Sequence, residues 1–143
     1  MVAFGHTAVG TLVGLITYQY LKDTNPAITL ITAGTAGVIS HYIADFIPHG
    51  HFIRHNDFKK RVWEIIIFDL GFSVVLLLAI SYFNFGQSLK TFAILFGIAG
   101  SQLPDVLDGL IYIKVLKAKG ILKLENNFHI AMHWHGKFEK SLV

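Results

Sequence analysis

The sequence contains no cysteine in its 143 residues, which excludes disulfide bonds and thiolate metal sites. Charged residues are also scarce, at 15%, whereas a soluble globular domain carries about 25%. Hydrophobic residues make up 53%, and the mean hydropathy is +0.55. A chain of this length cannot hide so much apolar surface from water. We therefore interpret it as a membrane protein, and we disfavour a soluble enzyme, a disordered tail or a polar binding module.

Four long segments are almost free of charge, and a membrane-spanning helix needs about 20 mostly apolar residues. No Asp, Glu, Lys or Arg occurs in the first three, and only two aspartates interrupt the fourth; the segments are 1–21, 24–44, 70–89 and 91–113. We predict an all-α fold, an integral membrane bundle of four transmembrane helices at 3–21, 26–47, 62–84 and 89–113. Residues 1–113 would form this domain. Residues 114–143 would form a C-terminal amphipathic, histidine-containing cytoplasmic segment that packs on it.

Lysine and arginine are distributed unevenly around these predicted spans. Ten of the twelve lie in the 50–61 loop or after residue 113, and only Lys22 and Lys90 lie on the other side. The positive-inside rule places the basic side in the cytoplasm, and four spans then place both termini there. Because the basic residues flank spans and form no separate basic face, we expect contact with anionic lipid headgroups and no nucleic-acid partner.

Several ionisable side chains interrupt the apolar helices, although a charged group at the bilayer centre costs at least about 2.5–3.5 kcal/mol. All of them lie near the cytoplasmic ends of their predicted helices, within roughly 15 Å of that boundary. Intramembrane ionisable groups are functional candidates because each needs a partner away from water. The residues are His6, His41, Asp45, Glu64, Asp69, Asp105 and Asp108.

The spacing of these residues indicates a metal site. His41, Asp45 and His49 follow one another at i, i+4 and i+8 and share a helix face. Asp105 and Asp108 are spaced i, i+3 and also share a face. Imidazoles and carboxylates together suit zinc and similar divalent ions, and bound cations would keep several carboxylates ionised in one dry layer. We predict a site for one to three divalent ions, with zinc the first choice.

Further residues are candidates to complete or surround this metal site. His6 and two histidines of the tail, His129 and His133, would reach it if the tail folds back over the cytoplasmic mouth. Glu64 and Asp69 are candidates for outer partners of the ligands, although a first-turn acid at a helix N-terminus is the preferred interpretation of Glu64. The remaining acidic residues are expected in solvent: Asp23, Asp57, Glu125 and Glu139.

Two segments resemble motifs of known metal-dependent hydrolases. The segment 40–49, SHYIADFIPH, resembles the His-x-x-x-Asp-x-x-x-Pro helix of the zinc-dependent phospholipase C and single-strand nuclease superfamily. The segment 103–108, LPDVLD, resembles the Leu-Pro-Asp-x-Asp motif of the YdjM family of membrane-bound metal-dependent hydrolases, and Gly5-His6 matches that family's early Gly-His. The motifs come here in a different order, and the family's Arg-Gly-x-Thr-His-Ser element is missing. The resemblance implies a helical, multi-metal site that cleaves phosphoesters in a prokaryotic inner (plasma) membrane.

The residues and the resemblance together predict a membrane-embedded hydrolase that acts on a phosphoester, such as a phospholipid, at the cytoplasmic face. The metal would polarise a phosphoryl oxygen and lower the pKa of a bound water toward ~7. Asp105 or Asp108 would serve as general base. A cluster in the 50–61 loop would bind the phosphate: Arg54, Lys59 and Lys60.

Two other functions use the same residues. A metal-ion or proton transporter or channel would line its pathway with these carboxylates and imidazoles, but the outer halves of the predicted helices carry almost no ionisable groups. A small metal-stabilised accessory protein without chemistry would also contain them. Because four spans make a thin bundle, we also consider a homo-oligomer.

Overall fold

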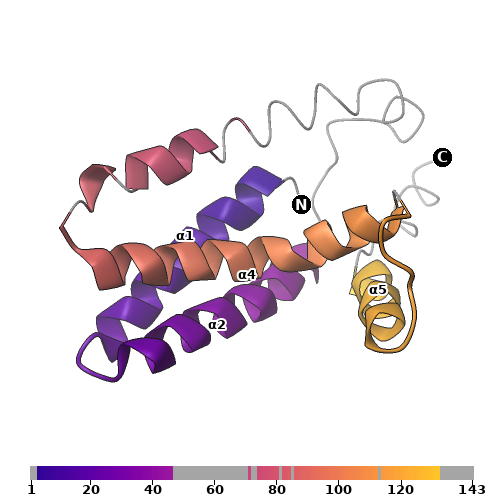
Figure 1. Cartoon of the computed structure of the whole chain (residues 1–143), viewed down its shortest axis with the longest axis horizontal. Helices are drawn as coiled ribbons and strands as arrows, with labels where there is room; N and C mark the ends of the chain where they lie inside the picture. The colour runs from indigo at the N-terminus through magenta and orange to yellow at the C-terminus, as the bar shows by residue number, and fades with distance from the viewer. Residues whose placement is uncertain are drawn as a thin grey trace.

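The computed structural model describes residues 3–46, 71, 74–80, 82–84, 86–112 and 114–132 of the chain. In this part of the chain the regular structure is helical, without strands, as the sequence predicts. Helices α1, α2 and α4 lie against one another, and α5 lies across one end of α4 (Figure 1). The bounds are α1 Ala3–Leu21, α2 Pro26–Phe46, α4 Ser88–Tyr112 and α5 Ile121–Met132.

The helices predicted at 3–21, 26–47 and 89–113 are confirmed, each within one residue of its expected ends. Of the helix predicted at 62–84, residues 74–80 and 82–83 are helical. Its earlier part, apart from Gly71, lies outside the described residues. The amphipathic tail is represented by the 12-residue helix α5, and the residues after Met132 are likewise outside the described part.

Two of the described helices, α2 and the Ser88–Ile111 part of α4, are long and apolar enough to cross a membrane, judged by length and composition. Four such spans were expected, and the described residues do not confirm that number. One reason lies in α1, which has 19 residues but includes a histidine, a glutamine and two tyrosines. These polar groups lower its mean hydropathy.

The turns between helices follow from local chemistry. Asn25 precedes α2 and its side-chain Oδ1 accepts a hydrogen bond from the backbone N–H of Ala27 at 2.9 Å, which caps the helix. Pro26 then begins the helix at the position where a missing N–H does no harm. Gly120 adopts a positive φ of 54° directly before α5, a conformation that glycine reaches without a steric penalty.

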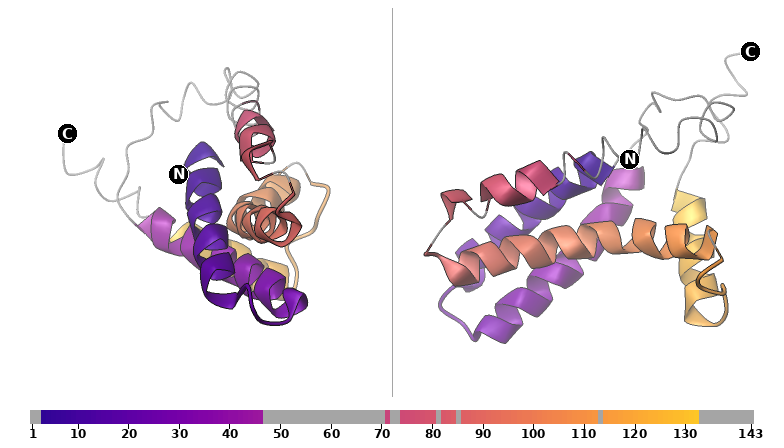
Figure 2. Two further views of the ribbon diagram at one scale, coloured as in Figure 1. Left: turned by 90° about the vertical axis from the view of Figure 1, so that its left-hand side faces the viewer. Right: turned by 45° about the horizontal axis from the view of Figure 1, so that its top comes forward.

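Glycines bring α1, α2 and α4 into backbone contact. A Cβ atom added at Gly10 would lie 2.7 Å from the Gly97 carbonyl oxygen, and one added at Gly14 would lie 2.5 Å from the Ala93 carbonyl oxygen. On the other side of α4, a Cβ at Gly37 would collide with the same Gly97 carbonyl. Small residues of this kind allow close approach where lipid supplies no hydrophobic force between helices. The three backbones therefore meet along α4, as the two views of Figure 2 show.

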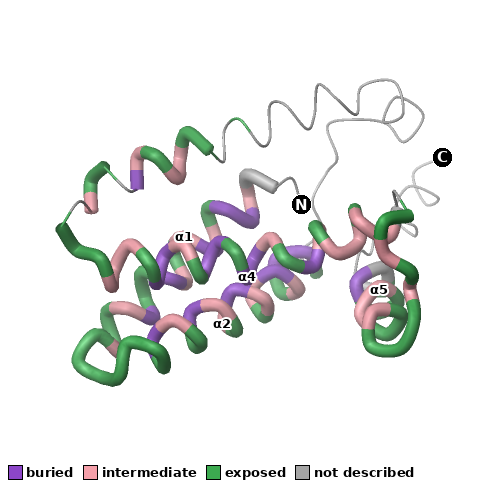
Figure 3. The backbone as a smooth tube through the Cα atoms, viewed as in Figure 1, coloured by how far each residue is buried: buried purple, intermediate pink, exposed green. Residues whose placement is uncertain are grey.

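Figure 3 shows which positions of the chain are buried, and the side chains at the most deeply buried of them are mainly polar. The largest fully buried side chains are mainly polar: His6, Thr7, Thr29, His41, Asp45, Ser101, Pro104 and His129. Large apolar side chains face outward on α2 and α4, among them Ile31, Ile43 and Phe92. Soluble monomers rarely expose so continuous an apolar surface. The outward-facing apolar side chains lie on the two helices that are long and apolar enough to cross a membrane.

The described part of the segment before α4 packs on one side of that helix. Ile80 forms a small buried apolar cluster with Ile94 and Ile98, and Leu76 and Leu77 pack against it. The described residues of this segment do not cover the opposite side of α4. Phe96 and Leu103 lie there, partly exposed, beside α2.

Candidate metal centre

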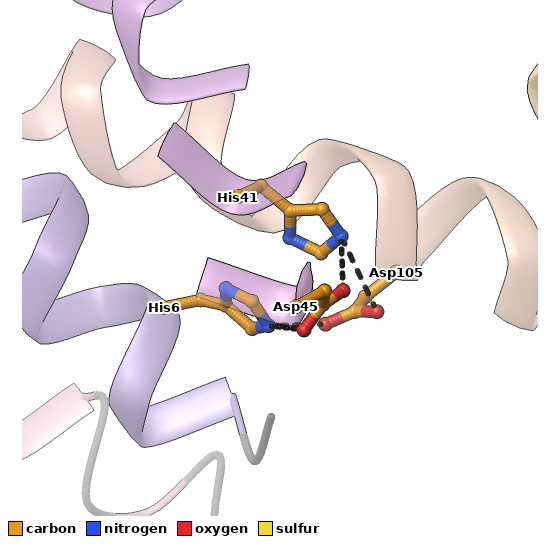
Figure 4. A group of neighbouring side chains, drawn as sticks. All are labelled: His6, His41, Asp45 and Asp105. Atoms are coloured by element: carbon orange, nitrogen blue, oxygen red, sulfur yellow. Dashed lines mark ion pairs between the residues drawn. The ribbon is translucent and has the colours of Figure 1, made fainter. Parts of the chain in front are cut away.

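Four side chains from three helices meet at one end of the bundle (Figure 4). His6 comes from the first turn of α1, His41 and Asp45 from the last turns of α2, and Asp105 from the last third of α4. One ligand atom from each lies within 4.8 Å of all the others. We call this set the central cluster. The i, i+4 spacing of His41 and Asp45 places both on the side of α2 that faces α4.

Asp45 is the centre of this arrangement. Its Oδ1 lies 3.2 Å from His6 Nε2, and its Oδ2 lies 3.1 Å from His41 Nε2. All three side chains are completely buried. A buried carboxylate in an apolar protein is costly unless cations or hydrogen-bond donors surround it. The two imidazoles supply part of that environment.

Asp105 forms the accessible side of the central cluster. Its Oδ2 is 3.6 Å from His6 Nε2 and its Oδ1 is 3.9 Å from His41 Nε2, which are looser contacts than those of Asp45. Its side chain is 32% exposed, whereas those of the other three are 0% exposed. Water or a substrate group can therefore reach the cluster beside Asp105.

His129, the only described histidine of the tail, reaches the same place from α5. Its Nε2 lies 3.2 Å from Asp45 Oδ2 and 3.5 Å from Asp105 Oδ1. It also lies 3.0 Å from His41 Nε2. Atoms bound to one ion at about 2.1 Å are roughly 3.0–3.4 Å apart in octahedral to tetrahedral geometry. The distances from Asp45 to the three imidazoles, and that between His41 and His129, therefore match the spacing of ligands around one ion.

Two of these histidines are oriented by the ring nitrogen that faces away from the cluster. His41 Nδ1 lies 2.8 Å from the Ser101 carbonyl oxygen, and His129 Nδ1 lies 2.6 Å from Asp108 Oδ2. A carbonyl and a carboxylate only accept hydrogen bonds, so Nδ1 is the donor in both rings. A neutral ring that donates through Nδ1 directs a lone pair from Nε2. Histidines that bind metals have this arrangement.

The facing Nε2 atoms favour a positive charge between them, which either a proton on His129 or a metal ion supplies. The Nε2 atoms of His41 and His129 both approach Asp45 Oδ2, so three acceptors would otherwise face one another. Burial alone would lower the pKa of His129, but Asp45, Asp108 and Asp105 outweigh burial and hold that pKa above its ordinary value. The same negative potential that favours a proton on His129 favours a divalent cation.

His6 supports the same interpretation. Neither ring nitrogen of His6 makes a hydrogen bond to a described residue, although Nε2 lies 3.2 Å from Asp45 Oδ1. Its ring stacks on that of His41, with ring centroids 4.1 Å apart. The Ser101 hydroxyl donates to the His6 backbone carbonyl at 2.7 Å and so fixes α1 against α4 at this level. Nε2 is the ring nitrogen that faces the two carboxylates, and an ion bound there would give this buried atom a partner.

A second group, the outer cluster, consists of Asp108, Glu125 and His129. Asp108 accepts from His129 Nδ1 and, through Oδ1, from the Asn126 side chain at 2.7 Å. Asp105 and Asp108 share a helix face in the sequence, but only Asp105 joins the central cluster. Asp108 lies behind His129, where it orients the ring.

Glu125 was expected in solvent, and that expectation is wrong. The Tyr42 hydroxyl donates to its Oε1 at 2.8 Å, and its Oε2 is buried without a hydrogen-bond partner among the described residues. Tyr42 also contacts Phe128 edge to face, with ring centroids 5.0 Å apart. These contacts dock α5 on α2. The helical period of α5 places Glu125, Phe128 and His129 on one face, and that periodicity was the available signal.

Seven further candidates from the sequence lie outside the described residues: His49, Arg54, Lys59, Lys60, Glu64, Asp69 and His133. Sequence reasoning also missed one contributor that is described. Ser101 carries no charge, yet its carbonyl orients His41 and its hydroxyl holds α1. It lies in the α4 turn before Pro104, and that turn lacks one helical hydrogen bond because proline has no N–H.

Comparison of the chain with protein-family models, with curated proteins and with solved structures finds no match. The family resemblance proposed from the two sequence motifs has no support from these comparisons. Function must therefore be argued from the site itself.

Proposed function

We propose that this chain is a membrane-embedded, metal-dependent hydrolase that cleaves a lipid-borne phosphoester near the membrane surface. The observation that carries the proposal is the convergence of three imidazole Nε2 atoms and two carboxylates from four helices. The following paragraphs give the support for the metal, for the chemistry and for the membrane.

The donor set favours a borderline divalent ion. Three imidazoles and two carboxylates suit zinc, and equally iron or manganese, whereas soft thiolate ligands are lacking from the sequence. His6, His41, His129 and Asp45 would hold the ion, because they are buried and mutually close. We propose zinc as the first ion to test.

The chemistry follows from the one exposed member of the set. A divalent ion supplies Lewis acidity toward a phosphoryl oxygen and lowers the pKa of a bound water. The Asp105 carboxylate, at the accessible side, is positioned to accept a proton from an attacking water. Asp108 keeps the His129 ring in the orientation that binds the ion.

The membrane context supports a lipid-borne substrate. The central cluster involves the last turns of α2, one of the two helices suited to crossing a membrane, and lies at the end of the bundle. The residues of the cluster are at the depth where the polar headgroups of a bilayer meet its hydrocarbon core. In a four-span arrangement with cytoplasmic termini, this depth lies on the cytoplasmic face.

The test separates metal binding from turnover in the detergent-purified full-length chain. Asp45→Asn should abolish stoichiometric zinc in elemental analysis, because it removes the carboxylate shared by three imidazoles. Asp105→Asn should retain metal and lower hydrolysis of a phospholipid in mixed micelles by roughly 10²–10⁴-fold, the usual contribution of a general base. Asp23→Asn, at an exposed position in the turn before α2, is the matched control and should change neither.

Undiminished hydrolysis in both Asp45→Asn and Asp105→Asn would overturn the catalytic assignment. Metal-dependent ion flux in proteoliposomes, lost in Asp45→Asn and unaccompanied by hydrolysis, would replace it with a transport function. Bound metal with neither hydrolysis nor ion flux would mean that the metal only stabilises the fold.

A further inference from the structure

Helix α5 carries an apolar stripe of exposed side chains, formed by Ile121, Leu124 and Phe128. These residues are 80%, 71% and 51% exposed, and their i, i+3 and i+7 positions place them along one side of the helix. Lys123 and Asn127 are exposed as well. At 3.6 residues per turn, Lys123 points about 160° away from Ile121. The surface of α5 that faces away from the bundle is therefore divided into an apolar and a polar side.

The contacts of α5 with the bundle differ on these two sides. Next to the apolar stripe, Glu125 and Phe128 contact Tyr42 of α2. Toward the polar side, the Asn126 side chain donates a hydrogen bond to Asp108 of α4. The apolar stripe is therefore on the side of α5 that lies against Tyr42.

Tyr42 and Asp108 lie at different levels of the bundle. Asp45 of α2 and Asp105 of α4 meet in the central cluster, and both helices approach that cluster with their C-terminal ends. Tyr42 precedes Asp45 by three residues and Asp108 follows Asp105 by three, so the two levels are about 9 Å apart, close to the diameter of a helix. Helix α5 therefore turns its apolar stripe toward the middle of the bundle and its polar side away from it.

The direction and level of α5 match the boundary of a bilayer. The right-hand view of Figure 2 shows α5 running across the direction of α4. Asp108 follows Ser88, the first residue of α4, by 20 residues, which is about 30 Å and equals the thickness of a hydrocarbon layer. Tyr20 and Tyr82, near the opposite end of the bundle, are exposed, and tyrosine is enriched where a membrane meets water. If the first boundary lies at these tyrosines, α5 lies in the plane of the second.

The charge around the apolar stripe indicates what covers it. Four lysines in and before α5 are exposed, whereas Glu125, the one acidic residue of the segment 114–132, is docked on Tyr42. A second copy of the chain at this stripe would bring like charges together. An anionic lipid surface fits both features, because apolar side chains enter its acyl boundary while lysines contact its headgroups. The lysines are Lys114, Lys117, Lys119 and Lys123.

We propose that α5 lies in the plane of an anionic lipid surface and that this contact holds His129 in the metal centre. His129 follows Phe128 of the apolar stripe, and its Nε2 lies 3.2 Å from Asp45 Oδ2. Lipid and metal therefore favour the same docked position of α5, and each raises the affinity of the protein for the other by the same factor. The proposal concerns control of the metal centre, and it requires metal binding but not hydrolysis.

The first experiment locates the apolar stripe, using the full-length chain in nanodiscs of phosphatidylcholine alone or mixed equally with phosphatidylglycerol. Because the chain has no cysteine, Ile121→Cys can be labelled singly with a bimane fluorophore. Asn127→Cys, exposed on the polar side of the same helix, is the matched control. With phosphatidylglycerol present, a lipid-borne nitroxide should quench the Ile121 label more strongly, and aqueous iodide should quench the Asn127 label more strongly. Equal quenching of the two labels by iodide would overturn the proposal.

The second experiment measures zinc affinity in the same two nanodiscs by competition with a chelator. We expect the dissociation constant to be at least about fivefold lower with phosphatidylglycerol, the lower end of usual couplings between two sites. Changing Lys117 and Lys119 together to glutamine should remove most of this difference. The same change at Lys22 and Lys90, at the opposite end of the bundle, is the matched control and should retain it. His129→Ala cuts the connection between α5 and the ion, so it reports only how much zinc the charged surface itself concentrates.

The outcomes separate this proposal from the hydrolase function. If His129→Ala shows the same lipid effect as the unaltered protein, or if both lysine pairs lose it equally, lipid contact does not control the metal centre. If the lipid effect on zinc follows α5 but no phosphoester is hydrolysed, this proposal stands and the hydrolase proposal fails. Protection of the Ile121 label from iodide in lipid-free micelles, together with cross-linked dimers, would assign the apolar stripe to a second copy and overturn the proposal.

Discussion

At the scale of single residues, the central cluster depends on atoms that lie outside it. The Nε2 atoms of His41 and His129 face each other at 3.0 Å because each Nδ1 donates to a fixed acceptor. For His41 the acceptor is a backbone carbonyl, which no substitution of Ser101 removes. For His129 it is the Asp108 carboxylate, which a substitution can change.

We expect Asp108→Asn to weaken zinc binding by about 10–100-fold, the usual cost of losing an outer partner of a metal-binding histidine. The amide keeps the shape of the side chain but is a weaker acceptor, and it can present an N–H to Nδ1 instead. Competition with a chromophoric chelator measures the affinity, and circular dichroism checks that helix content is retained.

The control for this prediction is Asp23→Asn, which removes an exposed carboxylate of the same type. If zinc affinity falls equally in Asp23→Asn, the effect is one of general charge. If it falls in neither, Asp108 does not orient His129.

At the scale of helices, two kinds of contact assemble the bundle. Glycine contacts bring α1, α2 and α4 together near the middle of each helix, with backbone atoms at the interface. Helix α5 has fewer contacts, chiefly those of Tyr42 with Glu125 and Phe128 and those of His129 with the clusters. Removal of metal should leave the packing of α1, α2 and α4 unchanged. It should weaken the docking of α5.

Two glycines of α4 test the first interface. Gly97→Ala would place a Cβ in contact with the Gly10 carbonyl and 2.9 Å from the Gly14 nitrogen, and overpacking of this kind costs about 1–3 kcal/mol. Gly109→Ala is the matched control, because nothing lies within 4 Å of its added Cβ. On helix propensity it should stabilise by up to about 1 kcal/mol.

Unfolding in mixed detergent micelles should therefore shift in opposite directions for these two variants. Equal destabilisation by both would mean that close approach at Gly97 does not limit the packing of α1 on α4.

Limited proteolysis tests the second interface. Three exposed lysines precede α5, Lys114, Lys117 and Lys119, and provide trypsin sites. Because His129 connects α5 to the cluster, a bound ion stabilises the docked helix through linkage. Removing metal with a chelator should speed cleavage in this segment, and adding zinc should slow it. In His129→Ala the rate should be high and independent of zinc. A zinc effect retained in that variant would contradict the role of His129.

At the scale of the whole molecule, the position of the buried polar side chains and the uneven distribution of basic residues together predict an orientation. Polar side chains gather inside one end of the bundle, and large apolar ones face outward on α2 and α4. Ten of twelve basic residues lie in the segments expected on the cytoplasmic side. The metal centre, at the ends of α1 and α2 nearest those segments, should therefore face the cytoplasm.

The lack of cysteine makes this orientation easy to measure, because single cysteines can be introduced without a background. Asp23→Cys, in the exposed turn between α1 and α2, should react in intact cells with a membrane-impermeant maleimide. Lys117→Cys, exposed between α4 and α5, should react only after permeabilisation. The reverse pattern would place the metal centre on the outer face.

The sequence by itself determined the helices and the level of the site. Helix bounds follow from local features, runs of apolar residues bounded by charges, Pro26 and glycines, and these were correct to within one residue for α1, α2 and α4. The depth of His6, His41, Asp45 and Asp105 follows from their positions along those helices. Depth fixes only one coordinate, however, and says nothing of which groups touch.

The tertiary structure decided the contacts. It separated Asp105, which joins the central cluster, from Asp108, which lies behind His129, although the two share a helix face in the sequence. It brought in Ser101 through a carbonyl, a group that every residue has, and Glu125 through the docking of α5. These assignments depend on the rotation of each helix about its axis and on the path of residues 114–120. Packing between helices sets both, and no local stretch of sequence encodes it.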